Sequence, residues 1–504
     1  MIPQATINVL MVIDSRGTYS TDFPFSLDTL VTLLREGNEE AVFTVTRAHR
    51  GTDDYAKGAD IKGFSFDDHP LDRYHELWLF GVGRKPENPL RDSEIERISW
   101  FMQQGGGVFA TGDHEDMGWA LCGKIPRVRS MRKWNWDDDT DPNDPIAPPE
   151  KAPGRHDTVQ RRYGDGPFTL DDQSDDIPQI ISPHYYRDDG RSAVHPLLTC
   201  GAGVITHFPD HPHEGDCYVP TNLTRTFLIS GQEYDEYPTT HPPRTVPEVV
   251  AWSTSGSRPA DRDDKGILDA TTFGAVCAYD GHQQDVGRVV VDATWHHFFG
   301  INLKGFAASQ TEPGRQAYRE ITQYFMNIGL WLLPPVAVDG LWRRASLAVR
   351  WHHQVGMGLR TEFYDDPSGL TLDLLRSTGQ SALTARPDAF FRLWVGRHGI
   401  GARFPRLWEI WGDTLDPWLP GTDPRPSPLP VHLVLQTLVG AIVYGIAATN
   451  RELTGETISR ALNTDQPGDP FLDRALTVLS EHATATAGRL GELTGSLTAA
   501  RNTS

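Results

Sequence analysis

Apolar runs and amphipathic stretches alternate along the first two thirds of the chain. Residues 7–13 form a nearly continuous apolar run, which is typical of a central parallel strand because such strands are covered on both faces. Further stretches of both kinds follow. We predict strands at 41–46, 76–83, 108–111, 249–253, 273–280 and 287–299, and helices at 25–34, 92–104 and 315–332. Strands that alternate with helices predict an α/β domain with a doubly wound, mainly parallel sheet.

The alternation stops after Pro334 and Pro335, and only helical patterns follow. They cover residues 341–357, 390–394, 433–448 and 471–493, with a proline-rich linker at 417–430. A chain of 504 residues is also too long for one ordinary domain. We therefore predict an α/β domain at residues 1–335 and an all-α domain at 336–504, and we expect the first to fold without the second.

Between about residues 134 and 188 the sequence becomes acidic and irregular, which predicts a long insertion over the edge of the sheet. Asp137, Asp139 and Asp141 alternate as in a calcium loop. The sixth and twelfth positions of that loop would be Pro142 and Pro148, where a calcium-binding EF-hand has glycine and glutamate. A solvated acidic loop is the favoured interpretation.

Composition narrows the range of partners. The chain has 47 basic and 67 acidic residues, a net charge of -20, which disfavours nucleic acid or an anionic membrane as the partner. A small-molecule ligand is favoured, with a protein partner or a second copy of the chain on the helical domain as a further option. Four cysteines without a CxxC pair, no signal-peptide pattern at the start and no apolar run of about 20 residues predict a cytoplasmic protein.

The candidate chemistry gathers in the stretch GGGVFATGDHEDM, residues 105–117. A short strand here ends in Gly112, and Asp113, His114, Glu115 and Asp116 follow at once. Open α/β sheets bind their ligands at the carboxyl ends of their strands. The glycine predicts a sharp turn that lifts one side chain into a crevice, as nucleophile elbows do, and His114 is the residue expected there.

Two motifs carry a resemblance to a known family. The run GGGVFATGDH resembles the GGGxxGxH segment of ThuA-like (trehalose-utilisation) proteins, which share the fold of class I glutamine amidotransferases. The run from Gly287 resembles that family's closing strand, GRVxxxxxGH, and places His296 on its histidine, with Trp295 in place of the glycine. The resemblance implies a flavodoxin-like fold and carbohydrate-related hydrolytic or isomerising chemistry. His114 occupies the position of the amidotransferase cysteine, so no glutaminase activity is expected.

These patterns define a set of candidate site residues. We predict His114, Glu115 and His296 as catalytic residues, and Asp14, Arg16, Asp113, Asp116, Trp295 and His297 as substrate-binding residues. Histidine suits proton transfer near neutral pH, and one of His296 and His297 could equally be a packed core residue. Histidine and carboxylate groups also bind divalent metals, so a metal stays an option and the cofactor stays undetermined.

Two further segments have open interpretations. Residues 207–214 contain three histidines and two carboxylates, which fits either a metal site or, as favoured here, a solvated rim loop. The basic run Arg127, Arg129, Arg132 and Lys133 fits an anion-binding site or, more commonly, a solvated helix face that pairs with the acidic insertion. The alternative to an enzyme is a non-enzymatic binding or scaffold protein with a degenerate crevice and a helical partner-binding domain.

Overall fold

The structure is a computed structural model of the whole chain and divides into two compact units. The larger unit is Gln4–Tyr186 with Ser192–Ala337, and the other is Met1–Pro3, Arg187–Arg191 and Val338–Ser504. The structure describes residues 5–38, 41–85, 87–114, 116–134, 176–188, 191–201, 203–209, 215–255, 271–338, 341, 345, 349, 352–359, 371–385, 389–394, 397 and 431–449.

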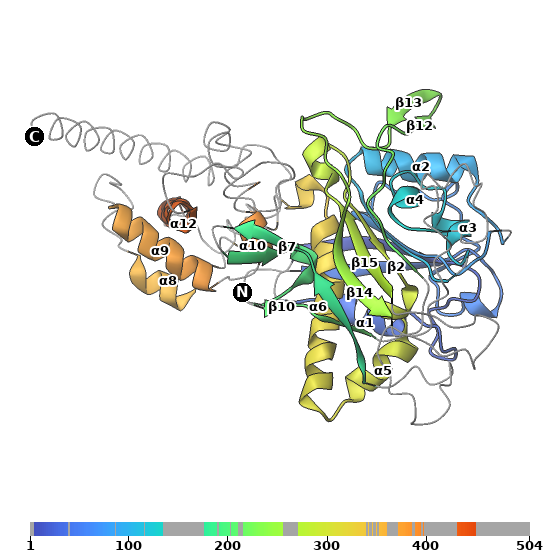
Figure 1. Cartoon of the computed structure of the whole chain (residues 1–504), viewed down its shortest axis with the longest axis horizontal. Coiled ribbons are helices and arrows are strands. Elements are labelled where there is room, and N and C mark those ends of the chain that lie inside the picture. The colour runs from blue at the N-terminus through green and yellow to red at the C-terminus, as the bar shows by residue number, and fades with distance from the viewer. Residues whose placement is uncertain are drawn as a thin grey trace, which may run out of the picture. The chain divides into compact units, whose positions relative to one another are not determined.

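A ten-stranded mixed sheet lies at the centre of the larger unit (Figure 1), in the order β11-β6-β14-β15-β16-β5-β4-β1-β2-β3. The six strands from β16 to β3 are parallel, and the other four extend the sheet by antiparallel pairing. The strands are β1 (Ala5–Ile13), β2 (Ala41–His49), β3 (Ile61–Lys62), β4 (Glu76–Phe80), β5 (Gly107–Thr111), β6 (Pro178–Pro183), β11 (His207–Pro209), β14 (Glu248–Ser255), β15 (Thr271–Tyr279) and β16 (Val289–Asp292). The predicted flavodoxin-like α/β class is confirmed.

Helices cover both faces of the parallel part of the sheet (Figure 1). On one face Ile98 and Met102 of α2 belong to the same buried cluster as Leu79. On the other face Phe109 of β5 packs on Phe298, which in turn packs on Phe325 of α6. The helices of this unit are α1 (Asp28–Glu36), α2 (Asp92–Gln103), α3 (Trp119–Cys122), α4 (Val128–Met131), α5 (Gly300–Ala308) and α6 (Glu312–Leu332), with 3-10 turns η1 (Asp54–Ala56), η2 (Pro196–Leu198), η3 (Gly281–Gln284) and η4 (Trp295–His297).

Two predicted boundaries were wrong. Residues 178–183 belong to the segment predicted as an irregular insertion, yet they form β6 inside the main sheet, between β11 and β14. The closing strand, predicted over residues 287–299, covers only Val289–Asp292. The chain turns there because the Thr294 side chain accepts a hydrogen bond from His296 N, which begins the 3-10 turn η4. Residues 135–175 of the insertion, with the three alternating aspartates, lie outside the described residues.

Three short hairpins accompany the main sheet. They are β7 (Tyr185–Asp188) with β8 (Arg191–Val194), β9 (Thr199–Cys200) with β10 (Gly203–Val204), and β12 (Thr226–Ile229) with β13 (Gln232–Asp235). The β12–β13 hairpin is fastened to α2, because Ser230 donates hydrogen bonds from its backbone N and its Oγ to Glu96 Oε1, at 2.6 and 2.8 Å.

Within residues 338–504 the described residues lie mainly in helices. They are α8 (His353–Gly358), α9 (Leu372–Ala385), α10 (Ala389–Leu393) and α12 (Val431–Thr449). Helices α9 and α12 approach closely at two glycines, since a Cβ on Gly379 would lie 1.7 Å from Gln436 O and one on Gly440 would lie 1.9 Å from Leu375 O. The predicted linker at 417–430 and the predicted helix at 471–493 lie outside the described residues. Among the helices that are described, none has the length and apolar character needed to cross a membrane.

Candidate functional site

The candidate site lies where the parallel strands β5 and β16 end side by side. The two strands are neighbours in the sheet, and the register pairs Thr111 with Asp292, the last residue of each strand. The loops that leave these strands therefore begin at the same edge. Residues 112–118 follow β5 and residues 293–299 follow β16, which brings two segments distant in sequence into contact.

Asp113 is the centre of this contact. Its side chain is fully buried, and its Oδ2 lies 2.6 Å from His114 Nδ1 and 3.7 Å from His296 Nε2. The Thr294 hydroxyl donates a hydrogen bond to Asp113 Oδ1 at 2.7 Å. The structure thus places the Asp113 carboxylate between His114 and His296, in contact with both imidazoles.

The two histidines differ in exposure. The side chain of His114 is 35% exposed, whereas that of His296 is 3% exposed. Burial lowers the pKa of His296 to about 3, against the opposing effect of Asp113, so this imidazole is neutral at pH 7. His114 is accordingly the histidine of this cluster that a dissolved ligand can reach.

Aromatic rings surround His296. The rings of Trp295, Phe25 and Phe299 have their centroids 4.0, 5.8 and 6.3 Å from its imidazole. Its Nδ1 lies 3.1 Å from Asn302 Oδ1 on α5. The ring is held between apolar packing on its faces and polar contacts at its two nitrogens, and so has a fixed orientation.

The loop after β5 is shaped by backbone hydrogen bonds. Asp113 N donates to Met117 O, Met117 N donates to His114 O, and Trp295 N donates to Gly112 O at 2.9 Å. Gly112 is required for space, because a Cβ there would lie 2.5 Å from Met117 O. The tight turn predicted from the glycine is present, and it orients Asp113 inward and leaves His114 partly exposed.

The other predicted residues of the neighbouring loops have structural contacts. Asp14 Oδ1 accepts hydrogen bonds from Val82 N and Gly83 N at 2.7 and 2.9 Å, and burial raises the pKa of this carboxyl. Its Oδ2 has no hydrogen-bond partner among the described residues. Asp116 accepts from Arg84 Nη1 at 3.1 Å and from the Lys85 backbone at 3.0 Å.

The remaining predicted residues lie at very different depths. Arg16 is exposed in the loop after β1, and Trp295 is buried. His297 is fully buried, with Nδ1 2.7 Å from Asp292 Oδ1 and Nε2 2.9 Å from Gln179 Oε1, which places it in the core. Glu115 lies outside the described residues.

The cysteines do not offer a nucleophile in the described cluster. All four are free thiols, and Cys122, the nearest in sequence to His114, is fully buried. Burial raises the pKa of the Cys122 thiol well above its usual value, which keeps it protonated.

The described residues contain no group of three or more histidine, cysteine, aspartate or glutamate side chains arranged to hold a metal ion. Within the segment 207–214, His207 Nδ1 lies 3.0 Å from Glu320 Oε2 of α6. Asp210, His211, His213 and Glu214 lie outside the described residues.

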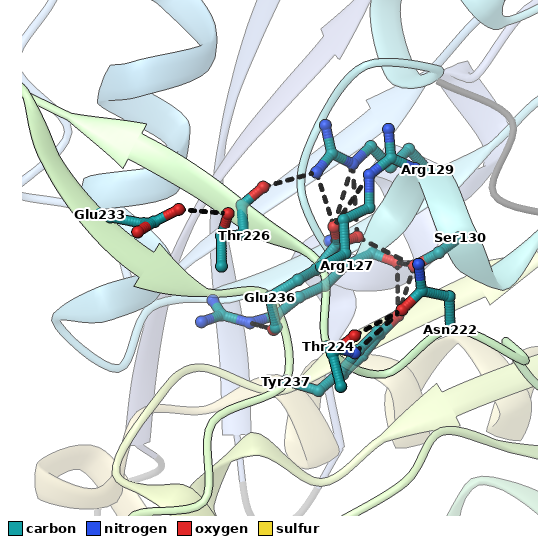
Figure 2. A network of polar contacts seen from close by, with 10 residues as sticks. Arg127, Arg129, Ser130, Asn222, Thr224, Thr226, Glu233, Glu236 and Tyr237 are labelled. Atoms are coloured by element: carbon teal, nitrogen blue, oxygen red, sulfur yellow. Dashed lines mark hydrogen bonds and ion pairs between the residues drawn. The ribbon is translucent and has the colours of Figure 1, made fainter. Parts of the chain in front are cut away.

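The basic run is buried, so its favoured interpretation as a solvated helix face was wrong. Arg127, Arg132 and Lys133 are at most 2% exposed. Figure 2 shows the reason for the first part of the run: Arg129 donates to the buried Glu236 carboxylate at 2.6 Å, and Arg127 donates from its backbone to the same carboxylate at 2.7 Å. These arginines anchor the end of the β12–β13 hairpin against α4.

Three contributors to the cluster were not predicted from sequence. Thr294, Asn302 and Phe25 all contact Asp113 or His296. Thr294 carries a weak signal, since it stands two residues before His296 in the loop after β16. Phe25 and Asn302 belong to other segments and carry none, because a lone aromatic or amide residue gives no indication of its partner.

Comparison with known proteins gives little further information. No family model and no curated protein matches the chain. Among solved structures, one from Parabacteroides merdae ATCC 43184 described as ThuA-like is similar, with a TM-score of 0.27 and 11% sequence identity over 66% of this chain and 90% of that one.

Proposed function

We propose that the α/β domain, residues 1–335, is an enzyme that transfers protons through His114, held by Asp113. The observation that supports it most is the 2.6 Å contact between the fully buried Asp113 carboxylate and the Nδ1 atom of a histidine whose side chain is 35% exposed. A buried carboxylate that accepts the Nδ1 proton makes Nε2 the basic nitrogen and stabilises the charged ring after it takes a proton.

The pair fits two classes of reaction. In a hydrolase, His114 takes a proton from the attacking water and returns it to the leaving group. In an isomerase, it takes a proton from a carbon next to a carbonyl group and returns it to the neighbouring atom. Neutral His296 and Thr294 contact Asp113 from the adjacent strand end and hold it in place. A carbohydrate-related small molecule is the substrate that the two sequence motifs favour.

The alternative is a binding or scaffold protein, in which residues 336–504 make the partner contacts and the Asp113 cluster only stabilises the loops. The two functions differ in a measurable way. An enzyme needs His114 for turnover, whereas a scaffold tolerates its loss. The wider question is whether a small molecule binds the native state at all.

The test uses the full chain and a panel of free sugars and p-nitrophenyl glycosides and esters. A ligand that binds only the native state raises the thermal midpoint, and a substrate releases nitrophenol. We expect His114→Gln and Asp113→Asn to remove both effects. The control is His207→Gln, which alters a histidine of similar exposure, 28%, that is also paired to a buried carboxylate but lies on β11. Wild-type protein that neither binds nor converts any compound would favour the scaffold.

A further inference from the structure

Arg132 connects the ends of the two strands that form the candidate site. It follows α4, is 1% exposed, and its Nη2 donates to Asp113 O at 2.6 Å and to Ala293 O at 2.8 Å. Its Nε also donates to Ala293 O, at 3.2 Å. One guanidinium therefore holds the backbone next to His114 on one side and the backbone before Thr294 on the other.

The guanidinium is itself held firmly. Its Nη1 donates to Lys133 O at 2.7 Å, and its plane lies over the Trp134 ring, 4.6 Å from the centroid. Gly215 packs against it, since a Cβ on Gly215 would lie 2.9 Å from Nη2 and 1.7 Å from Ala293 O. Every nitrogen of the guanidinium donates to a backbone carbonyl, so Arg132 has a fixed position rather than a ligand-binding role.

The charge of Arg132 matters as well as its shape. Burial lowers the pKa of the guanidinium, with Cys217 and Asp113 acting in the opposite direction, and an arginine stays charged at neutral pH. The attraction between this buried cation and Asp113 favours the charged form of the carboxylate. A charged carboxylate is what holds the Nδ1 proton of His114.

We propose that Arg132 is a positioning residue for the acid/base pair: by fixing the Asp113 backbone and favouring the charged carboxylate, it keeps His114 in the form protonated on Nδ1. The inference rests on the proposed function of the Asp113 and His114 pair. Lysine cannot replace Arg132, because a single ammonium group lacks the planar fork that reaches both carbonyls.

The experiment measures the His114 ring in the full chain labelled with ¹⁵N-histidine. Imidazole nitrogen shifts near neutral pH distinguish the Nδ1-protonated from the Nε2-protonated ring, and His114→Gln identifies the signal. We expect the Nδ1-protonated form to be the large majority in wild type and a minority in Arg132→Lys. Arg129→Lys is the matched control, because Arg129 belongs to the same buried run but contacts Glu236, and it should leave the His114 signal unchanged.

Trp134→Leu provides a second route if Arg132→Lys does not fold, since it loosens the guanidinium without removing it, and we expect an intermediate change. A wild-type His114 signal in folded Arg132→Lys would overturn the positioning role while leaving the proposed function intact. A wild-type protein with His114 mainly protonated on Nε2 would instead contradict the proposed function itself. The two failures are distinguishable, because the first is seen in the variant and the second in the wild-type protein, and neither measurement needs a substrate.

Discussion

Two buried carboxylates in the larger unit, Glu236 and Asp113, have opposite kinds of partner. Glu236 accepts hydrogen bonds from Arg129, the Arg127 backbone and Ser130, at 2.6, 2.7 and 2.9 Å. Arginine and backbone donors keep their protons at all ordinary pH values. Asp113 is paired instead with the imidazole of His114, a side chain that can act as donor or acceptor and is partly exposed.

The difference indicates what each cluster does. A carboxylate enclosed by permanent donors has one stable state, and Glu236 thereby joins the hairpin to α4 (Figure 2). A carboxylate next to a partly exposed histidine leaves that ring within reach of a ligand. Two buried carboxylates of the same unit thus differ, one in a structural contact and the other in the role that we propose for catalysis.

The largest effect is expected from Glu236→Gln. This change leaves the largely buried Arg129 without the carboxylate that its guanidinium contacts at 2.6 Å, and breaking a buried ion pair costs about 3 to 5 kcal/mol. Urea unfolding measures the free energy of unfolding. The control is Glu312→Gln, which breaks an exposed pair with Arg315 and should cost far less. Equal losses for the two variants would show that Glu236 is not an anchor.

Asp113→Asn should reduce the free energy of unfolding less than Glu236→Gln does, but it should reduce the proposed activity more. The amide keeps the shape of the side chain and can still contact Thr294, so we expect a loss of about 2 kcal/mol. The amide cannot hold the Nδ1 proton as a carboxylate does, so ligand conversion by His114 should fall at least as far as in His114→Gln. Turnover that survives in a folded Asp113→Asn protein would remove the distinction between the two carboxylates.

The buried His296 predicts a specific sensitivity to acid. Its folded-state pKa is about 3, below that of an unfolded histidine, so its contribution to stability is complete above about pH 6.5 and is lost as the pH falls toward 3. Between pH 7.5 and 5.5 this amounts to about 1.4 kcal/mol. We expect His296→Gln to lose less stability over that interval than wild type. A wild-type slope in the variant would mean that the folded-state pKa of His296 is close to that of an unfolded histidine.

The smallest effect is expected from removing the helical domain. A chain that ends at Pro335 keeps both carboxylate clusters, and we propose that it folds with nearly unchanged cooperativity and the same His114 behaviour. Circular dichroism and denaturant unfolding of residues 1–335 measure this. An insoluble product, or one that unfolds without cooperativity, would show that the two parts depend on each other.

The sequence patterns predicted where the strands of the site end, but they did not predict which side chains contact each other there. The β5 strand, the turn at Gly112 and the nearness of His114 to His296 follow from periodicity and from the rule for parallel strands. The role of Asp113 as the shared partner did not, because four ionisable residues in a row give no signal of which one points inward.

The buried basic run could not be predicted for a related reason. Arginine and lysine are mostly exposed, so RVRSMRK favours a surface face. Arg127 is buried next to its partner Glu236, which lies 109 positions away in the sequence. No local pattern connects the two residues, so the burial could not be predicted. His297 shows the same limit, since its core partner Gln179 belongs to β6, in a segment whose composition predicted no strand.

We propose that Asp113 makes His114 basic at a position where the imidazole is partly exposed. The most direct measurement is the rate at which diethyl pyrocarbonate modifies each histidine of the native full chain, followed by peptide mass spectrometry. We predict that His114 reacts much faster than the buried His296 and His297, and that Asp113→Asn slows His114 while leaving His207 unchanged. A His114 rate no higher than those of the two buried histidines, or one unaffected by Asp113→Asn, would contradict the claim.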